Sequence, residues 1–180
     1  MKKQITLIWV LVFIFTTNSA QAFDGKRKGF ILGSALGLGY MSSNTFKHLM
    51  LPFEINVGHA PSNTTEIYFT MKVDSWFGEP GFGTLAMYGV GGNYYGLSEK
   101  WFLTSAVGWT VVTGASESEG QALIGWAYSV GVGYQFGKHW HVKAEALSSD
   151  MIGIATSSSG GTENFVKSLN LRVTLSVMAF

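Results

Sequence analysis

Residues 122–136 alternate so regularly that they limit the fold of this chain more than any other stretch. Every second residue is large and apolar: Ile124, Trp126, Tyr128, Val130, Val132, Tyr134 and Phe136. The intervening residues are small or uncharged: Gly125, Ala127, Ser129, Gly131, Gly133 and Gln135. A period of two indicates a β-strand, and roughly 9 to 11 tilted strand residues cross a bilayer. We interpret this stretch as one strand of a small transmembrane β-barrel with a narrow, crowded lumen.

The same alternation recurs along the chain and predicts eight strands. They cover approximately 29–40, 51–59, 65–77, 83–95, 101–113, 122–136, 140–150 and 165–180. In the fourth strand, residues 85–88 are apolar on both faces, so its inward set is ambiguous. The fold class that follows is all-β, an eight-stranded antiparallel up-and-down transmembrane β-barrel. A soluble eight-stranded barrel is the architectural alternative, but its outer face would have to be polar.

The start of the chain has the pattern of a secretory signal peptide. Lys2 and Lys3 precede an apolar run over 5–15, and small residues follow up to Ala20-Gln21-Ala22. We expect cleavage after Ala22, which gives a signal peptide over 1–22 and one outer-membrane barrel domain over 23–180. The next residues, up to Lys28, are expected to form a solvated tail.

Charge and composition exclude several classes of function. Without Lys2 and Lys3 the formal net charge falls from +1 to −1, which argues against a nucleic-acid partner. The chain has no cysteine, and it has no P-loop, zinc-protease spacing or nucleophile elbow. His139 and His141 could share a face, but two ligands do not close a metal site. We therefore expect no cofactor and no metal.

Eight strands would put both chain ends on the side that bacterial barrels keep in the periplasm. Aromatic residues gather at the periplasmic strand ends and predict a girdle made of Tyr94, Tyr95, Trp101, Tyr134, Phe136 and Trp140. The outer loops would present Glu79, Glu117, Glu119 and Glu163.

The inward set of several strands carries charge. Charges away from water need partners, so we expect a polar network in the lumen. Its members would be Glu54, Lys72, Lys143, Glu145 and Arg172. Glu145 would pair with Arg172 or Lys143, and Glu54 with Lys72. Such a network would fill the lumen and leave no open pore, with a small ion-conducting barrel as the alternative.

Three segments make the chain resemble the small eight-stranded outer-membrane barrels of Gram-negative bacteria, the OmpA transmembrane domain, OmpX and opacity-type class. They are Lys28-Gly29-Phe30-Ile31-Leu32-Gly33 with the glycines at 37 and 39, Val130-Gly131-Val132-Gly133-Tyr134-Gln135-Phe136, and the terminal Phe180. The resemblance implies a monomer in the cell outer membrane, in contact with membrane lipids and lipopolysaccharide and with an unknown surface ligand.

In that family the barrel assembly machinery reads a terminal Phe with apolar residues at alternate positions before it. Phe180 would be this signal, but Arg172, Thr174 and Ser176 have its parity, so a bulge near 177–179 is expected to reconcile the pattern.

A further resemblance gives an enzymatic alternative. His48, expected in the first outer loop, and Asp74-Ser75 at the outer end of the third strand are similar to the His, Asp and Ser of the lipid A palmitoyltransferase, another eight-stranded barrel. Acyl transfer would need His48 to reach Ser75 and Asp74 to orient the histidine. Adjacent strand residues face opposite sides, and the expected lumen is charged, unlike the apolar lumen of that enzyme. We therefore predict a non-enzymatic barrel with a structural or surface-contact role.

Overall fold

The computed structural model describes residues 27–43, 47–78, 81–96, 98–114, 123–153 and 165–180. The predicted signal peptide lies outside these residues, as do Glu79, Glu117, Glu119 and Glu163. Within the described ranges no helix is both long and apolar enough to cross a membrane.

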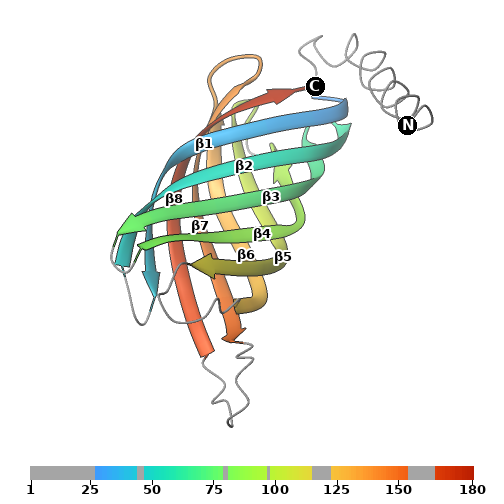
Figure 1. The fold of residues 1–180 in the computed structure, drawn as a ribbon. Coiled ribbons are helices and arrows are strands. Elements are labelled where there is room, and N and C mark those ends of the chain that lie inside the picture. The colour runs from blue at the N-terminus through green and yellow to red at the C-terminus, as the bar shows by residue number, and fades with distance from the viewer. Residues whose placement is uncertain (1–26, 44–46, 79–80, 97, 115–122, 154–164) are drawn as a thin grey trace, which may run out of the picture.

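Eight strands form one closed antiparallel barrel, as the sequence predicts. They are β1 (Gly29–Ser43), β2 (Lys47–Ser62), β3 (Thr65–Gly78), β4 (Gly81–Tyr94), β5 (Trp101–Gly114), β6 (Leu123–Gln135), β7 (Trp140–Gly153) and β8 (Phe165–Ala179). Each strand pairs with the next, and β1 pairs with β8 to close the sheet. The strands tilt strongly around the barrel axis (Figure 1), which a small closed sheet requires.

Inward and outward residues alternate along every strand, as their alternation in the sequence predicts. In β6, for example, Val130 is exposed while Ala127 and Ser129 are buried. The ambiguity in β4 is also resolved, because Leu85 and Met87 face the lumen. A closed ladder pairs the backbone polar groups of every strand. A barrel with large apolar side chains on its outer wall can therefore lie in hydrocarbon without unsatisfied backbone groups.

The first connection is shorter than expected. β1 continues to Ser43 and β2 begins at Lys47, so His48 lies in a strand and not in a loop. The ladder pairs Met41 with His48 and Gly39 with Met50, which extends the sheet beyond the predicted ends.

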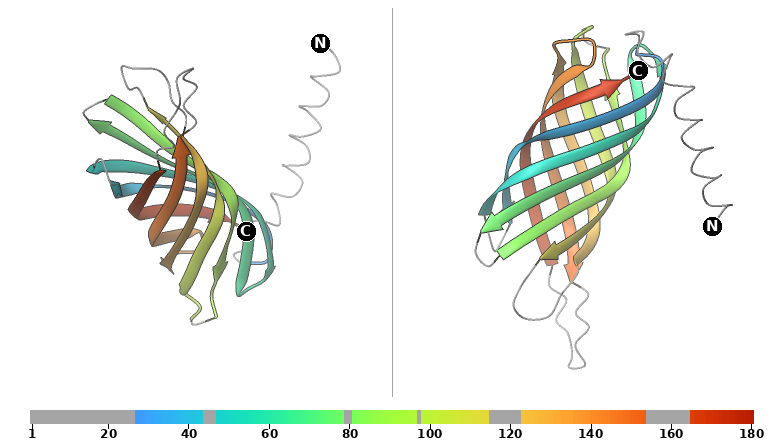
Figure 2. Two further views of the ribbon diagram at one scale, coloured as in Figure 1. Left: turned by 90° about the horizontal axis from the view of Figure 1, so that it is seen from below. Right: turned by 45° about the horizontal axis from the view of Figure 1, so that its top comes forward.

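The two ends of the barrel differ in their connections. The end that holds the start of β1 and the end of β8, called the terminal end below, has connections 63–64, 95–100 and 136–139. The opposite end, called the loop end, has connections 44–46, 79–80, 115–122 and 154–164. Two further views show these ends at opposite poles of the barrel (Figure 2). The longest connections therefore lie together, away from the C-terminus.

Two inward glycines make room for aromatic rings inside the barrel. A Cβ at Gly133 would lie 2.1 Å from the ring of Phe102, and one at Gly83 would lie 2.2 Å from the ring of Trp76. These distances are too short for non-bonded carbon atoms, so even Ala would displace a ring. The bare face that the sequence shows in β6 is thus partly space for aromatic side chains of neighbouring strands.

Candidate functional site

Six ionisable side chains meet in the middle of the lumen and form the charged cluster. They are the five predicted network residues, Glu54, Lys72, Lys143, Glu145 and Arg172, together with Asp74, and all are buried. Three acids face three bases, so the cluster is formally neutral. A buried ionic group is tolerated only when its charges are paired in this way.

Glu54 is the hub of the charged cluster. Its Oε1 lies 2.5 Å from Lys143 Nζ, and its Oε2 lies 3.4 Å from Lys72 Nζ and 3.5 Å from Arg172 Nη2. One carboxylate therefore contacts three cations that come from β3, β7 and β8. The predicted contact between Glu54 and Lys72 is present.

Glu145 forms an ion pair with neither of its predicted partners, Arg172 and Lys143. Glu145 Oε1 lies 2.5 Å from Lys72 Nζ, although Arg172 is its register neighbour on β8. Arg172 instead approaches Asp74, with 3.6 Å between Nε and Oδ1. Long side chains cross this narrow lumen, so a residue on the far wall can be nearer than the residue on the next strand.

Neutral polar side chains extend the charged cluster toward both ends. Asn56 Nδ2 donates to Glu54 at 2.6 Å, and Asn170 Nδ2 donates to Asp74 at 2.8 Å. Nearer the terminal end, Tyr68 donates to Asn93 at 2.9 Å, and Asn93 donates to Glu66 at 2.6 Å. These bonds satisfy part of the polar groups inside the lumen, while Asn56 Oδ1, Glu66 Oε1 and Asn170 Oδ1 have no hydrogen-bond partner.

The lumen near the loop end is apolar, which corrects the prediction of a polar lumen throughout. The apolar layer consists of Met41, Met50, Trp76, Leu85, Met87, Ala106, Ala127, Leu147 and Met151. Sequence reasoning placed polar residues inside and apolar residues outside, so it missed this layer. The sequence does carry a signal for this layer, because its methionines occupy the inward-facing positions of their strands. Flexible methionines fill irregular space well, and here they leave the loop-end lumen packed.

Aromatic side chains close the terminal end. Phe180 is buried, with its ring 6.1 Å from that of His141 and 6.3 Å from that of His139. The ladder of β8 with β1 continues in register to Ala179, so the bulge expected near 177–179 is absent. Met178 and Phe180 therefore face inward, where they pack with Ile31 and Ala60.

Tyr95 belongs to this closure and not to the girdle. It is only 3% exposed, and its ring lies 4.8 Å from that of Phe102. Tyr95 directly follows β4 and continues the inward parity of Gly91 and Asn93, so its side chain points toward the lumen at the barrel end. The prediction that it faces the membrane was wrong.

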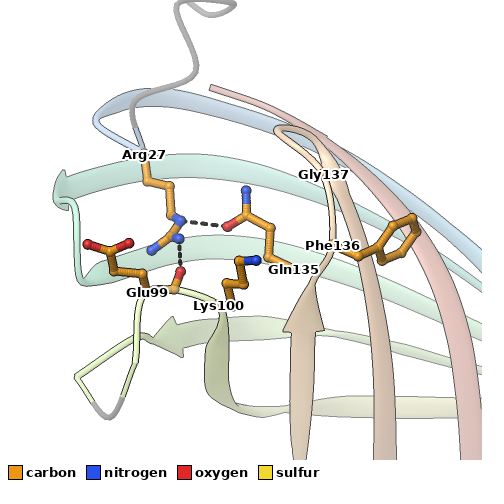
Figure 3. Close-up of a pocket in the computed structure, with 6 residues that line it drawn as sticks. All are labelled: Arg27, Glu99, Lys100, Gln135, Phe136 and Gly137. Atoms are coloured by element: carbon orange, nitrogen blue, oxygen red, sulfur yellow. Dashed lines mark hydrogen bonds between the residues drawn. The ribbon is translucent and has the colours of Figure 1, made fainter.

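Arg27 ties the terminal end together, which corrects the expectation of a solvated tail. Its guanidinium donates to Gln135 Oε1 at 2.8 Å, to Asn63 O at 3.2 Å and to Glu99 O (Figure 3). It also lies 3.8 Å from the centre of the Tyr95 ring. Arg27, two residues before β1, thereby joins the connections 63–64 and 95–100 to the end of β6. No sequence pattern pointed to it, because two of its partners are backbone carbonyls.

No protein-family model matches the chain, and no curated protein matches it in sequence. Solved structures do match its fold. Neisserial surface protein A, NspA, is 15% identical with a TM-score of 0.57, over 83% of this chain and 96% of that chain. Ail, the attachment invasion locus protein of Yersinia pestis, is 12% identical with a TM-score of 0.56, over 84% of this chain and 99% of that chain. The chain folds as a small outer-membrane β-barrel.

The outer wall of this barrel carries aromatic residues near both ends. At the terminal end, Trp101 pairs with Tyr134 at 5.0 Å and Phe136 with Trp140 at 6.5 Å, and Tyr94 is also exposed. Toward the loop end, the pairs are Phe77 with Phe82 at 5.1 Å and Trp109 with Trp126 at 4.9 Å. Sequence reasoning missed this second group because apolar residues surround it.

The barrel does not assemble the three residues of the enzymatic alternative. His48 stacks on the inward Trp76, with 6.5 Å between ring centres. Asp74 is buried in the charged cluster, where Asn170 and Arg172 contact it. Ser75 lies on the opposite face of β3 from Asp74 and Trp76, so its hydroxyl points away from both. His48 and Ser75 are thus on different sides of the wall.

No group of three or more potential metal-binding acids or histidines occurs among the described residues. His139 Nδ1 lies 2.9 Å from the carbonyl oxygen of Met178, and His141 is buried among aromatic rings. The two histidines therefore contribute to the closed terminal end.

Proposed function

We propose that this barrel is a non-enzymatic outer-membrane protein with a closed lumen, in a structural or surface-contact role. The observation that supports the proposal is that side chains fill the lumen at three levels. Phe180 and Tyr95 close the terminal end, the charged cluster occupies the middle, and the apolar layer fills the loop end. Small barrels with filled interiors have no path for a solute.

In this proposal the terminal end faces the periplasm and the loop end faces the cell exterior. Short periplasmic turns and longer external loops are usual for bacterial barrels. The signal peptide over 1–22 is removed after Ala22, and the barrel over 23–180 remains as a monomer in contact with lipids and lipopolysaccharide. A surface role agrees with the names of NspA, Neisserial surface protein A, and Ail, the attachment invasion locus protein.

Planar-bilayer recording tests whether the lumen is closed. The purified mature protein is expected to give no steady single-channel currents, because an apolar layer and an ionic cluster lie in series. Reproducible current steps that scale with protein concentration would contradict the proposal and favour the ion-conducting alternative.

An assay of acyl transfer from phospholipid to lipid A tests the enzymatic alternative. We expect no product from the purified barrel in detergent, because His48 and Ser75 lie on different sides of the wall. Transfer that is lost in both His48→Ala and Ser75→Ala variants would overturn the non-enzymatic assignment. A Ser62→Ala variant serves as the hydroxyl-loss control at the other end of the barrel.

Loop shortening separates a structural role from a surface-contact role. Connections 115–122 and 154–164 are replaced by short Gly-containing turns, and the variant is expressed in cells that lack the gene. A structural role predicts that the variant restores resistance of the membrane to detergent. A surface-contact role predicts normal resistance even in cells without the barrel, and cell binding that the wild-type barrel restores and the loop-shortened variant does not.

A further inference from the structure

A pocket of about 220 Å³ opens at the terminal end between segments that are distant in the sequence. Its lining consists of Arg27, Glu99, Lys100, Gln135, Phe136 and Gly137 (Figure 3). At about 30 Å³ for each water molecule, this space can hold a phosphate group with several waters.

Neither cationic group of this pocket forms an ion pair among the described residues, although the buried Glu66 is near enough to Arg27 to interact with its charge. Arg27 donates only to neutral oxygens, those of the Gln135 side chain and of two backbone carbonyls. A guanidinium has five N–H donors, so two remain available. The ion pairs of the described residues include neither Arg27 nor Lys100. In Figure 3 the Glu99 carboxylate lies on the Arg27 side and away from the Lys100 ammonium, so Lys100 is the less compensated of the two cations.

The level of the pocket indicates which anion it meets. Phe136 lines the pocket and is 55% exposed, and Trp101, which follows the lining residue Lys100, is 53% exposed. Exposed aromatic residues at barrel ends lie at the level of the lipid headgroups. Phosphodiesters are the anions of that layer, and Arg and Lys are the side chains that best bind phosphate oxygens.

We propose that Arg27 and Lys100 bind the phosphodiester of a phospholipid headgroup in the leaflet at the terminal end. The inference rests on the membrane placement in the proposed function and adds a ligand class to it. Phosphatidylglycerol should bind better than phosphatidylcholine, because its phosphate has no ammonium of its own nearby to compete with Lys100.

Native mass spectrometry of the mature barrel in a neutral detergent tests the proposal. The probes are phosphatidylglycerol, a diacylglycerol with the same acyl chains and no phosphate, and soluble glycerophosphoglycerol. Phosphatidylglycerol should give a stoichiometric adduct that the diacylglycerol does not. Lys100→Gln should weaken this adduct on the order of tenfold, the loss of one charge-assisted contact.

Lys47→Gln is the matched control, because it removes the same charge from an exposed lysine at the loop end. It should leave the phosphatidylglycerol adduct unchanged. Arg27→Lys keeps the charge but removes the planar fork, and it should also weaken the adduct. Because Arg27 also joins the hairpins, the thermal unfolding of the Arg27→Lys variant is measured in parallel. The conclusion about lipid binding is drawn from Lys100→Gln.

Three outcomes would overturn the proposal. Equal loss in Lys100→Gln and Lys47→Gln would mean general charge attraction, and an equal adduct with diacylglycerol would mean acyl-chain binding alone. Glycerophosphoglycerol that binds as tightly as the lipid would assign the pocket to a free phosphodiester. Ion currents or acyl transfer would contradict the proposed function while leaving the headgroup result unaffected, so the two failures are distinguishable.

Discussion

At the scale of single residues, the charged cluster shows what a sequence can and cannot specify. Glu54, Lys72 and Arg172 were predicted to lie inside because alternation fixes which way a strand residue points. The contact between Glu54 and Lys72 followed from their position on neighbouring strands, but the partner of Glu145 did not. The pair between Lys72 and Glu145 spans the lumen, so it depends on the barrel diameter and on side-chain length.

Glu54→Gln should destabilise the barrel strongly. Three buried cations contact this carboxylate, and its neutralisation leaves the cluster with one excess positive charge. Removal of one partner from a buried ion pair costs about 3–5 kcal/mol, and we expect a loss of that order in urea unfolding from lipid vesicles. Glu99→Gln, at the exposed rim, is the control and should change little. A stability equal to wild type for Glu54→Gln would contradict the hub role.

At the scale of the strands, alternation predicted the wall well and its ends poorly. The inward set of β4 was ambiguous because a polar lumen was expected, whereas Leu85 and Met87 face an apolar layer. Tyr95 lies just past β4 but keeps the inward parity of Asn93, so alternation already indicated that only one of the neighbours Tyr94 and Tyr95 faces outward. Arg27 precedes β1 and binds carbonyl oxygens, which leave no trace in a sequence pattern.

The pairing of β5 with β6 gives a test at this scale. Gly133→Ala places a Cβ against the Phe102 ring and should cost about 1–3 kcal/mol of unfolding free energy through overpacking. Phe102→Leu in the same chain should recover part of this loss, because it removes the ring edge that the methyl group meets. A double-mutant cycle measures the coupling between the two sites. Strictly additive losses would mean that the two residues do not touch.

At the scale of the whole molecule, the barrel is a packed interior inside an apolar wall. Val130 lies in the middle of β6 on the exposed face, so Val130→Lys should place a charge in the hydrocarbon. We expect a loss of about 2–4 kcal/mol in unfolding from vesicles. Tyr94→Lys, at a strand end among the aromatic residues, should lose at most about 1 kcal/mol. Equal losses at both positions would argue against a membrane across the middle of β6.

The account depends most directly on which face of the strands contacts lipid. Spin labels are placed at Val130 and Val132 in vesicles, with a label at Lys138 in the exposed β6–β7 turn as the aqueous reference. Relaxation by oxygen, which concentrates in the bilayer, and by a water-soluble nickel chelate reports the surroundings of each label. The account predicts that oxygen dominates at Val130 and Val132 and the nickel chelate at Lys138. Strong relaxation of the Val130 and Val132 labels by the nickel chelate would contradict it.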